Sequence, residues 1–488
     1  MEKSFLLRSS LFSLIVCLFL FPVIHMLLYV PLKPLGWDPI LLDVVWGSII
    51  QATLSTALTV VIGFLGALGF IGLSKNISEK TTLLLSTFII LPSFVPPLVV
   101  VLLGTQAIGV YLTGLWGIVF FHVLMNVGII GLILSNIIIK KSKVWNDLCF
   151  VEGVSWAKYY FRGLLPSLKS DFKIVSLFLF VLYFLSFSIP LLVGNLRFGG
   201  LEVFIYEKIF LFGNWSEATQ YALLFLIILL CFSYIVDRYK VEQEIYSETK
   251  SVLEGFSSSW FIILLLIPVL IMIVGFINSM VKIEYSQFYF DWAQARGTML
   301  TGLLSGSFVF VVLSLLGYCY MSPKVSRWLF SLIAPSWVIV GFSFFILGNN
   351  DVGASFFKVS VALTILYVPY LFRLSYFSLL SNLRSQVQVA LVSGANWNKI
   401  FFIIIWPQVL PTICFLSGVS AVWACGDFAL SGMLLGEDMT LALQMKSLLT
   451  NYRLEQSILL LLPLVIVSVI IYLIFQGLAY VCRRNLLS

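Results

Sequence analysis

The amino-acid sequence predicts an all-α polytopic membrane protein with about twelve transmembrane helices in two homologous six-helix halves. Sixty per cent of the 488 residues are hydrophobic and only 10% are charged, whereas ordinary soluble domains are roughly 45–50% apolar. A repeat is the second observation, since a set of residues recurs at a constant displacement of 241 positions. Gly153, Trp156, Phe161 and Pro166 return as Gly394, Trp397, Phe402 and Pro407. Two fused copies of one membrane unit produce such a pattern.

Apolar runs long enough to cross a bilayer occur along the whole chain, because about 20 helical residues span about 30 Å of hydrocarbon. The first run has the basic start of a signal peptide, but Pro22 and His25 interrupt it and no small-residue cleavage site follows. We therefore expect it to be a retained helix. The expected spans are 8–30, 46–73, 83–104, 113–139, 172–194, 216–236, 258–278, 298–322, 326–348, 357–380, 411–433 and 456–482.

A charged segment from Asp237 to Ser257 interrupts the apolar runs near the middle of the chain. It is typical of a linker, and it divides the chain into a first repeat over 1–240, a linker over 241–257 and a second repeat over 258–488.

The distribution of lysine and arginine predicts the orientation. With the amino terminus in the cytoplasm, 21 of the 29 basic residues fall on the cytoplasmic side, as the positive-inside rule requires. Both termini, the linker and both repeated segments then share the cytoplasm. The eight basic residues left outside are Lys33, Arg197, Lys208, Lys282, Arg296, Lys358, Lys446 and Arg453.

Several other classes of protein are disfavoured. The net charge of +7 is spread over short loops rather than gathered on one face, which argues against nucleic-acid binding. The cysteines lie mostly in apolar runs without a C-x-x-C pair, so neither a metal site nor a disulfide framework is expected. They are Cys17, Cys149, Cys231, Cys319, Cys414, Cys425 and Cys482.

The two repeated segments, over 141–170 and 382–411, each predict a helix, a turn at a glycine, a second short helix and a proline that ends it. Ser155 or Asn396 is expected to cap the second short helix. The result would be a compact elbow that protrudes from the membrane.

Both elbows resemble the cytoplasmic EAA loop of binding-protein-dependent ABC importer permeases, in which an E-A-A triplet precedes a glycine and, about a dozen residues later, a Leu-Pro pair. The glycine and proline match in both copies, whereas the triplet differs. It is Asp147-Leu148-Cys149 in the first copy and Gln388-Val389-Ala390 in the second.

Within that superfamily the chain is similar to the fused twelve-helix permeases for iron(III) and thiamine. Supporting segments are Gly117-Ile118 with His122 and Asn126, Phe187 to Gly194 with Leu201 to Tyr206, Cys425 to Phe428, and Thr440-Leu441 with Tyr452-Arg453. No residue distinguishes the two substrates.

The resemblance implies the type I permease fold of ABC importers, in the inner membrane. It also implies a periplasmic substrate-binding protein and a separate ATPase dimer that docks on the elbows and uses the ATP. The chain itself has no phosphate-binding G-x-x-x-x-G-K-[ST] loop, so we expect a non-catalytic subunit that binds no cofactor and no metal. The expected coupling residues are Asp147, Cys149, Gly153, Val154, Ser155, Trp156, Phe161, Pro166, Gln388, Ala390, Gly394, Ala395, Asn396, Trp397, Phe402 and Pro407.

A second group of residues lies within the predicted spans and is expected to line a translocation pathway. Proline breaks helical hydrogen bonds but is also common in membrane helices, His122 can be a ligand or a bundle hydrogen-bonding group, and Asp427 can lie inside the membrane or in water at a helix end. The group comprises Pro92, Pro96, Pro97, His122, Asn126, Pro335 and Asp427.

Two other functions stay open. A secondary transporter driven by an ion gradient also uses internal repeats, but it usually needs buried charges, and apart from Asp427 these spans hold almost none. A structural membrane protein would explain the apolar spans but not two elbows directed at the same compartment.

Overall fold

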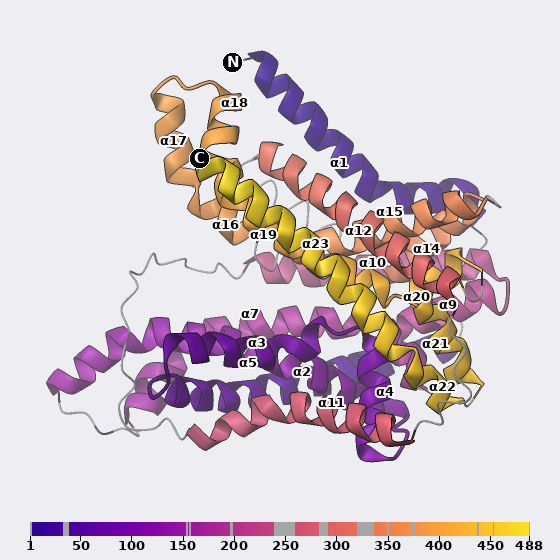
Figure 1. The fold of residues 1–488 in the computed structure, drawn as a ribbon, viewed down its shortest axis with the longest axis horizontal. Coiled ribbons are helices and arrows are strands. Elements are labelled where there is room, and N and C mark those ends of the chain that lie inside the picture. Colours follow the sequence, from indigo (N-terminus) through magenta and orange to yellow (C-terminus); the bar gives the residue numbers. More distant parts are fainter. Residues whose placement is uncertain are drawn as a thin grey trace. The chain divides into compact units, whose positions relative to one another are not determined.

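A computed structural model describes residues 2–32, 39–152, 155, 158–195, 199–238, 259–282, 291–319, 336–348, 351–372, 376–436, 439–451 and 453–487. Over these residues the chain is helical and contains no strand (Figure 1). The expected linker 241–257 lies outside them. The chain divides into two compact units, which we treat separately.

One unit comprises residues 38–201 and 238–282. Its longest helices are α2 (Pro39–Ser74) and α5 (Gly114–Glu152), and α2 packs against both α5 and α7 (Leu165–Phe184). The other elements are α3 (Glu79–Phe94), α4 (Pro97–Ile108), η1 (Tyr159–Leu164), α8 (Ser188–Val193), η2 (Ser259–Ile262) and α11 (Ile263–Lys282).

The other unit comprises residues 1–37, 202–237 and 283–488. Here α12 (Trp292–Cys319) packs against α15 (Val352–Leu371) and α19 (Trp406–Cys425). The remaining elements are α1 (Glu2–Tyr29), α9 (Leu201–Phe210), α10 (Trp215–Arg238), α14 (Trp337–Ile346), α16 (Phe377–Asn382), α17 (Arg384–Val392), α18 (Trp397–Lys399), η5 (Ile400–Ile405), α20 (Ala429–Leu434), α21 (Leu441–Thr450), α22 (Leu454–Leu459) and α23 (Leu461–Leu487).

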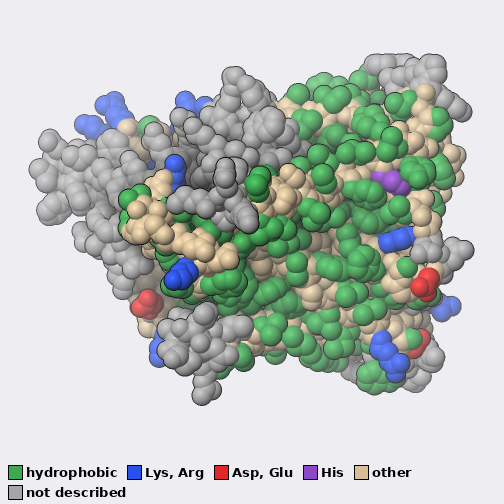
Figure 2. Space-filling view, turned by 90° about the horizontal axis from the view of Figure 1, so that it is seen from above, with side chains coloured by type: hydrophobic (Ala, Val, Ile, Leu, Met, Phe, Trp, Pro, Cys, Tyr) green, Lys and Arg blue, Asp and Glu red, His purple; other side chains and the backbone are tan. Residues whose placement is uncertain are grey.

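Eight described helices are long and apolar enough to cross a membrane, and nine if one bent pair counts as a span. The bent pair is α3 and α4, which meet at an angle of 102°. The other three of the twelve expected crossings do not qualify among the described residues: α7 carries Lys169, Asp171 and Lys173, and the apolar helices Trp215–Cys231 and Trp337–Ile346 are short. Figure 2 shows the surface expected for such a protein, with hydrophobic side chains over most of one face and charged side chains toward its ends.

The compact units do not follow the order of the chain, because the first helix of each sequence repeat packs with helices of the other repeat. Helix α1 lies against α14 and α12, and the His25 Nδ1 and Ser343 Oγ atoms are 3.2 Å apart. Helix α11 lies against α4, where the Asn278 side-chain amide donates to the Gln106 carbonyl. Each repeat therefore packs its first helix against the other repeat.

The secondary structure repeats with the same displacement as the sequence. The π-helix η1 (Tyr159–Leu164) recurs as η5 (Ile400–Ile405), α7 recurs as α19 and α8 as α20, and both bounds of each element shift by 241 positions. Each unit also contains a similar tertiary hydrogen bond, although its residues are not displaced by 241 positions: the backbone N–H of Leu201 donates to the Ser48 hydroxyl oxygen, and that of Leu441 donates to the Thr298 hydroxyl oxygen.

Candidate functional site

The second elbow is described without interruption from Tyr376 to Trp406, and α17 and α18 form a projecting hairpin (Figure 1). Helix α17 ends at a glycine with left-handed backbone, as expected, since φ of Gly394 is 76°. The N–H of Ala395 donates to the carbonyl of Ala390 at 3.1 Å, and that of Gly394 donates to the carbonyl of Leu391 at 3.1 Å. This is the Schellman arrangement that closes a helix at glycine.

Of two local expectations for the elbow, one is met in part and one is wrong. Asn396 is the N-cap residue of α18 and has extended backbone, as expected, but its side chain makes no capping hydrogen bond. The proline does not end the second short helix either, because Pro407 lies in the first turn of α19, directly after η5.

Pro166 lies in the first turn of α7 in the same way, after η1. Proline has no N–H to donate, and its ring crowds the carbonyl four residues earlier. A π-turn with one extra residue relieves that clash while the helix continues.

Trp397 anchors the second elbow to its own unit. Its ring is 4% exposed, its indole N–H donates to the carbonyl of Tyr318 at 3.0 Å, and the guanidinium carbon of Arg8 lies 3.9 Å from its ring centroid. The Tyr318 hydroxyl donates to the Asn398 side-chain oxygen, and the Tyr318 and Phe401 rings form a T-shaped pair. The last turn of α12 and the first turns of α1 therefore hold the elbow.

The outer surface of the second elbow carries exposed apolar side chains among polar and charged ones such as Arg384 and Lys399. Val392 is 90% exposed, and Val389, Phe402 and Ile403 are also exposed. A β-carbon added at Gly394 would meet no atom within 4 Å. Exposed apolar side chains on a projecting turn are typical of a docking surface. Of the remaining expected residues, Gln388 is exposed and Ala390 and Ala395 are partly buried.

The first elbow is described in part. Gly153, Val154 and Trp156 lie outside the described residues, as do the side chains of Asp147 and Cys149 on α5. Ser155 and Pro166 are exposed. Phe161 is 73% exposed, like its counterpart Phe402 at 59%.

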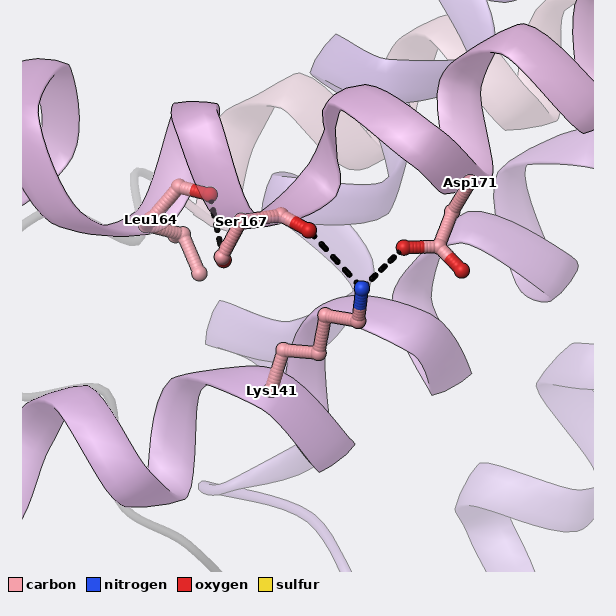
Figure 3. Close-up of polar contacts among 4 residues, drawn as sticks. All are labelled: Lys141, Leu164, Ser167 and Asp171. Atoms are coloured by element: carbon pink, nitrogen blue, oxygen red, sulfur yellow. Dashed lines mark hydrogen bonds and ion pairs between the residues drawn. The ribbon is translucent and has the colours of Figure 1, made fainter. Parts of the chain in front are cut away.

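In each repeat, polar side chains join the helix before the elbow turn to the helix after it. In the first, Lys141 on α5 forms an ion pair with Asp171 on α7 and donates to the carbonyl of Ser167 at 2.8 Å (Figure 3). In the second, the amide of Gln408 on α19 donates to the side chain of Gln386 on α17 at 2.8 Å. Gln408 is the counterpart of Ser167. The two contacts therefore join equivalent helices, by an ion pair and a hydrogen bond in the first repeat and by an amide hydrogen bond in the second.

The expected pathway residues lie in three separate places: at the bend between α3 and α4, in a polar cluster around His122 and in a polar cluster around Asp427. Pro92 lies inside α3, Pro96 precedes α4 and Pro97 begins it, so the prolines do break this span. The residue expected to match them, Pro335, lies outside the described residues.

His122 belongs to a satisfied polar cluster within its own helix bundle. Its Nε2 is 2.9 Å from the Ser186 hydroxyl, its Nδ1 is 3.1 Å from the Ser55 hydroxyl, and its ring stacks on Tyr183 at 4.5 Å. Asn126 donates to the carbonyl of His122. Of the two readings of this histidine, the geometry favours the one in which it joins α2, α5 and α7 within the bundle.

Asp427 is 6% exposed, so it lies at the end of α19 but out of water. Its carboxylate accepts from the backbone N–H of Ser431 at 2.7 Å and from the Ser431 hydroxyl at 2.9 Å. These contacts anchor the start of α20. Ser186 occupies the equivalent position in the first repeat and contacts His122 instead.

Glu202 is a buried acid that sequence reasoning did not select. It is fully buried, and its Oε2 accepts from the Ser336 hydroxyl at 2.9 Å and from the backbone N–H of Val338 at 3.1 Å. Its Oε1 has no hydrogen-bond partner among the described residues. Burial raises the pKa of this carboxyl to about 8, against those hydrogen bonds. An acid between Leu201 and Val203 in a chain with so few charges was the available signal.

No protein-family model matches this chain, and neither a curated protein nor a solved structure matches it.

Proposed function

We propose that this chain is the transmembrane permease subunit of an ATP-driven ABC importer. It would cross the membrane twelve times in two homologous halves, with both termini in the cytoplasm. The observation that carries the proposal is the duplicated elbow, in which a π-helix and the helix after it recur at the same displacement as the glycine, tryptophan, phenylalanine and proline.

The geometry of the second elbow supports docking of a soluble partner. Its turn closes at Gly394, Val392 projects outward, and Trp397 ties it to the ends of α12 and α1. A force applied at the turn would thus act on two long helices. Two elbows suit a dimeric ATPase, whose closure on ATP would move the halves and open a route for a solute delivered by a binding protein.

Iron(III) and thiamine are the proposed substrates, on the resemblance of the sequence alone. Uptake of labelled thiamine and labelled ferric iron into cells that express the chain with its ATPase and binding protein separates them. If neither solute is taken up in an ATP-dependent way, both proposed substrates are excluded.

The docking step has a sharper test in co-purification with the ATPase. Val392→Asp replaces an exposed apolar side chain at the tip of the elbow with a charge, and it should reduce retention of the ATPase at least tenfold. Val352→Asp is the matched control, because Val352 is also exposed but begins α15, away from the elbow. Equal ATPase retention by both variants would contradict the proposal.

An ion-gradient-driven transporter remains the second candidate, and Glu202 is the observation that favours it. A fully buried carboxyl with one oxygen unpartnered among the described residues is a group that can bind a proton. Uptake that continues without ATP but stops when the proton gradient collapses would select this alternative.

A further inference from the structure

Each repeat binds the first helix of the other repeat, and the two bound helices use the same face. Helix α1 packs on α12 and α14 of the second repeat, and α11 packs on α2 and α4 of the first. Buried positions of α1 return as buried positions of η2 and α11, displaced by 250 positions. They are Phe12, Ile15, Phe19, Pro22 and His25 in α1, and Ile262, Leu265, Val269, Met272 and Gly275 in η2 and α11. The same displacement relates Ser48 to Thr298, which accept the similar hydrogen bonds described above.

Helices α4 and α14 also correspond to each other, with a displacement of 239 positions. Gly109 follows α4 and Gly348 follows α14, and both have left-handed backbone, with φ of 76° and 56°. Ser343 of α14 is therefore the counterpart of Gly104 in α4. The contact of α1 with Ser343 and the contact of α11 with Leu103, the neighbour of Gly104, thus lie in equivalent places.

These two equivalent contacts differ in size. In the second repeat the imidazole of His25 lies beside Ser343, with its Nδ1 3.2 Å from the hydroxyl oxygen. In the first repeat α11 lies so close to α4 that a β-carbon on Gly275 would be 2.7 Å from the carbonyl carbon of Leu103. That carbonyl is backbone and cannot rotate away. The place that Gly275 takes therefore has no room for a histidine.

A second difference in size separates α2 from α12. A β-carbon on Gly69 of α2 would be 2.5 Å from the carbonyl carbon of Phe261 in η2. At the displacement of 250 positions, the counterpart of Gly69 in α12 is Cys319, which is buried. The backbone of η2 therefore approaches α2 where that helix has no side chain, and at the same distance from α12 it would overlap Cys319.

We propose that these two differences in size determine which repeat each first helix joins. His25 excludes α1 from the first repeat, because its imidazole would overlap the Leu103 carbonyl, and Cys319 excludes α11 from the second. Clashes in the wrong pairing are a general means of keeping similar interfaces apart. In the second repeat α11 would also leave unfilled the space that the imidazole occupies beside Ser343. This assignment does not depend on the transport function proposed above.

The test uses the full chain, with its native cysteines changed to alanine, and measures the disulfide yield between introduced cysteines. Asn278→Cys with Gln106→Cys reports α11 on α4, because the Asn278 side chain reaches the Gln106 carbonyl. Phe21→Cys with Phe344→Cys reports α1 on α14, because the two rings form a T-shaped pair. Gly275→His should lower the α11–α4 yield about tenfold, through overpacking, and leave the α1–α14 yield unchanged.

A third pair of cysteines detects the wrong pairing. Phe21→Cys with Thr105→Cys joins α1 to α4, because Thr105 is the counterpart of Phe344. This disulfide should be absent from the chain that carries only the reporter cysteines and from Gly275→His, in which α1 still has His25. It should form in the double variant His25→Gly with Gly275→His, within one chain or between two copies. Its absence there, or its formation while His25 is present, would overturn the proposal.

Two further variants separate helix pairing from general damage. Gly69→Ser gives α2 a side chain about the size of that of Cys319, and it should lower the α11–α4 yield about tenfold without lowering the α1–α14 yield. Gly477→His is the matched control, because a β-carbon there would meet no atom within 4 Å, and it should change none of the three yields. Equal loss of the α11–α4 disulfide in Gly477→His and Gly275→His would also contradict the proposal, because any added histidine would then have the same effect.

Discussion

The guanidinium of Arg8 lies 3.9 Å from the ring centroid of Trp397, although the two residues are 389 positions apart in the chain. The contact joins the first turns of α1 to the elbow of the second repeat. Since the Trp397 N–H also bonds to Tyr318, one indole ring links three segments: α1, the end of α12 and the elbow.

This contact predicts an energetic coupling between the two residues. A cation over a tryptophan face contributes about 0.5–2 kcal/mol, depending on its desolvation. A double-mutant cycle with Arg8→Ala and Trp397→Leu, measured by unfolding of the purified chain, should therefore give a coupling energy of about 1 kcal/mol. Arg8→Lys should retain most of it. Arg384→Ala, an exposed arginine on the same elbow, should show no coupling to Trp397.

Gly394→Ala should destabilise the elbow by about 1 kcal/mol, because alanine resists the left-handed backbone at φ 76°. The cost is conformational, since the added β-carbon would have open space. Limited proteolysis within 384–399 should detect it as faster cleavage. Gly353→Ala is the control: that glycine also has open space but lies in α15 with ordinary helical backbone, so its substitution should leave cleavage unchanged.

Gly275→Ala should disrupt the packing of α11 on α4. A β-carbon there would lie about 2.0 Å from the carbonyl oxygen of Leu103, which is backbone and cannot rotate away. We expect a loss of about 1–3 kcal/mol, measured as a lower thermal midpoint. The same change at Gly477, where no atom lies within 4 Å, should have little effect. A similar loss at both positions would show that the α11–α4 contact is not responsible.

Glu202 predicts a pH dependence of stability. Its folded pKa is about 8, above the ordinary value of 4.5, so the folded chain holds a proton that the unfolded chain releases. Stability should therefore be highest below about pH 4.5 and fall as pH rises toward about 8, by at most about 1.4 kcal/mol per unit. In the Glu202→Gln variant the thermal unfolding midpoint should change little with pH over that range. A midpoint that falls equally in both proteins would assign the dependence to other groups.

Much of the local architecture was predictable because it follows from short-range rules. Gly394 was expected at a turn and has the left-handed backbone that ends α17. The prolines near residue 96 were expected to interrupt a helix, and α3 and α4 meet there at 102°. The expectation that Pro407 ends a helix was wrong, because a π-turn absorbs the clash and the helix continues.

The amino-acid sequence by itself determined the membrane character and the duplication of the elbow, because apolar run length and residue spacing are properties of a linear chain. Only the tertiary structure decided that α1 packs with the second repeat and α11 with the first, that Glu202 is buried against the start of α14, and that Arg8 covers Trp397. These contacts join residues more than a hundred positions apart. An apolar helix in lipid has many faces of similar hydropathy, so its neighbours are selected by shape and by a few hydrogen bonds that no local pattern encodes.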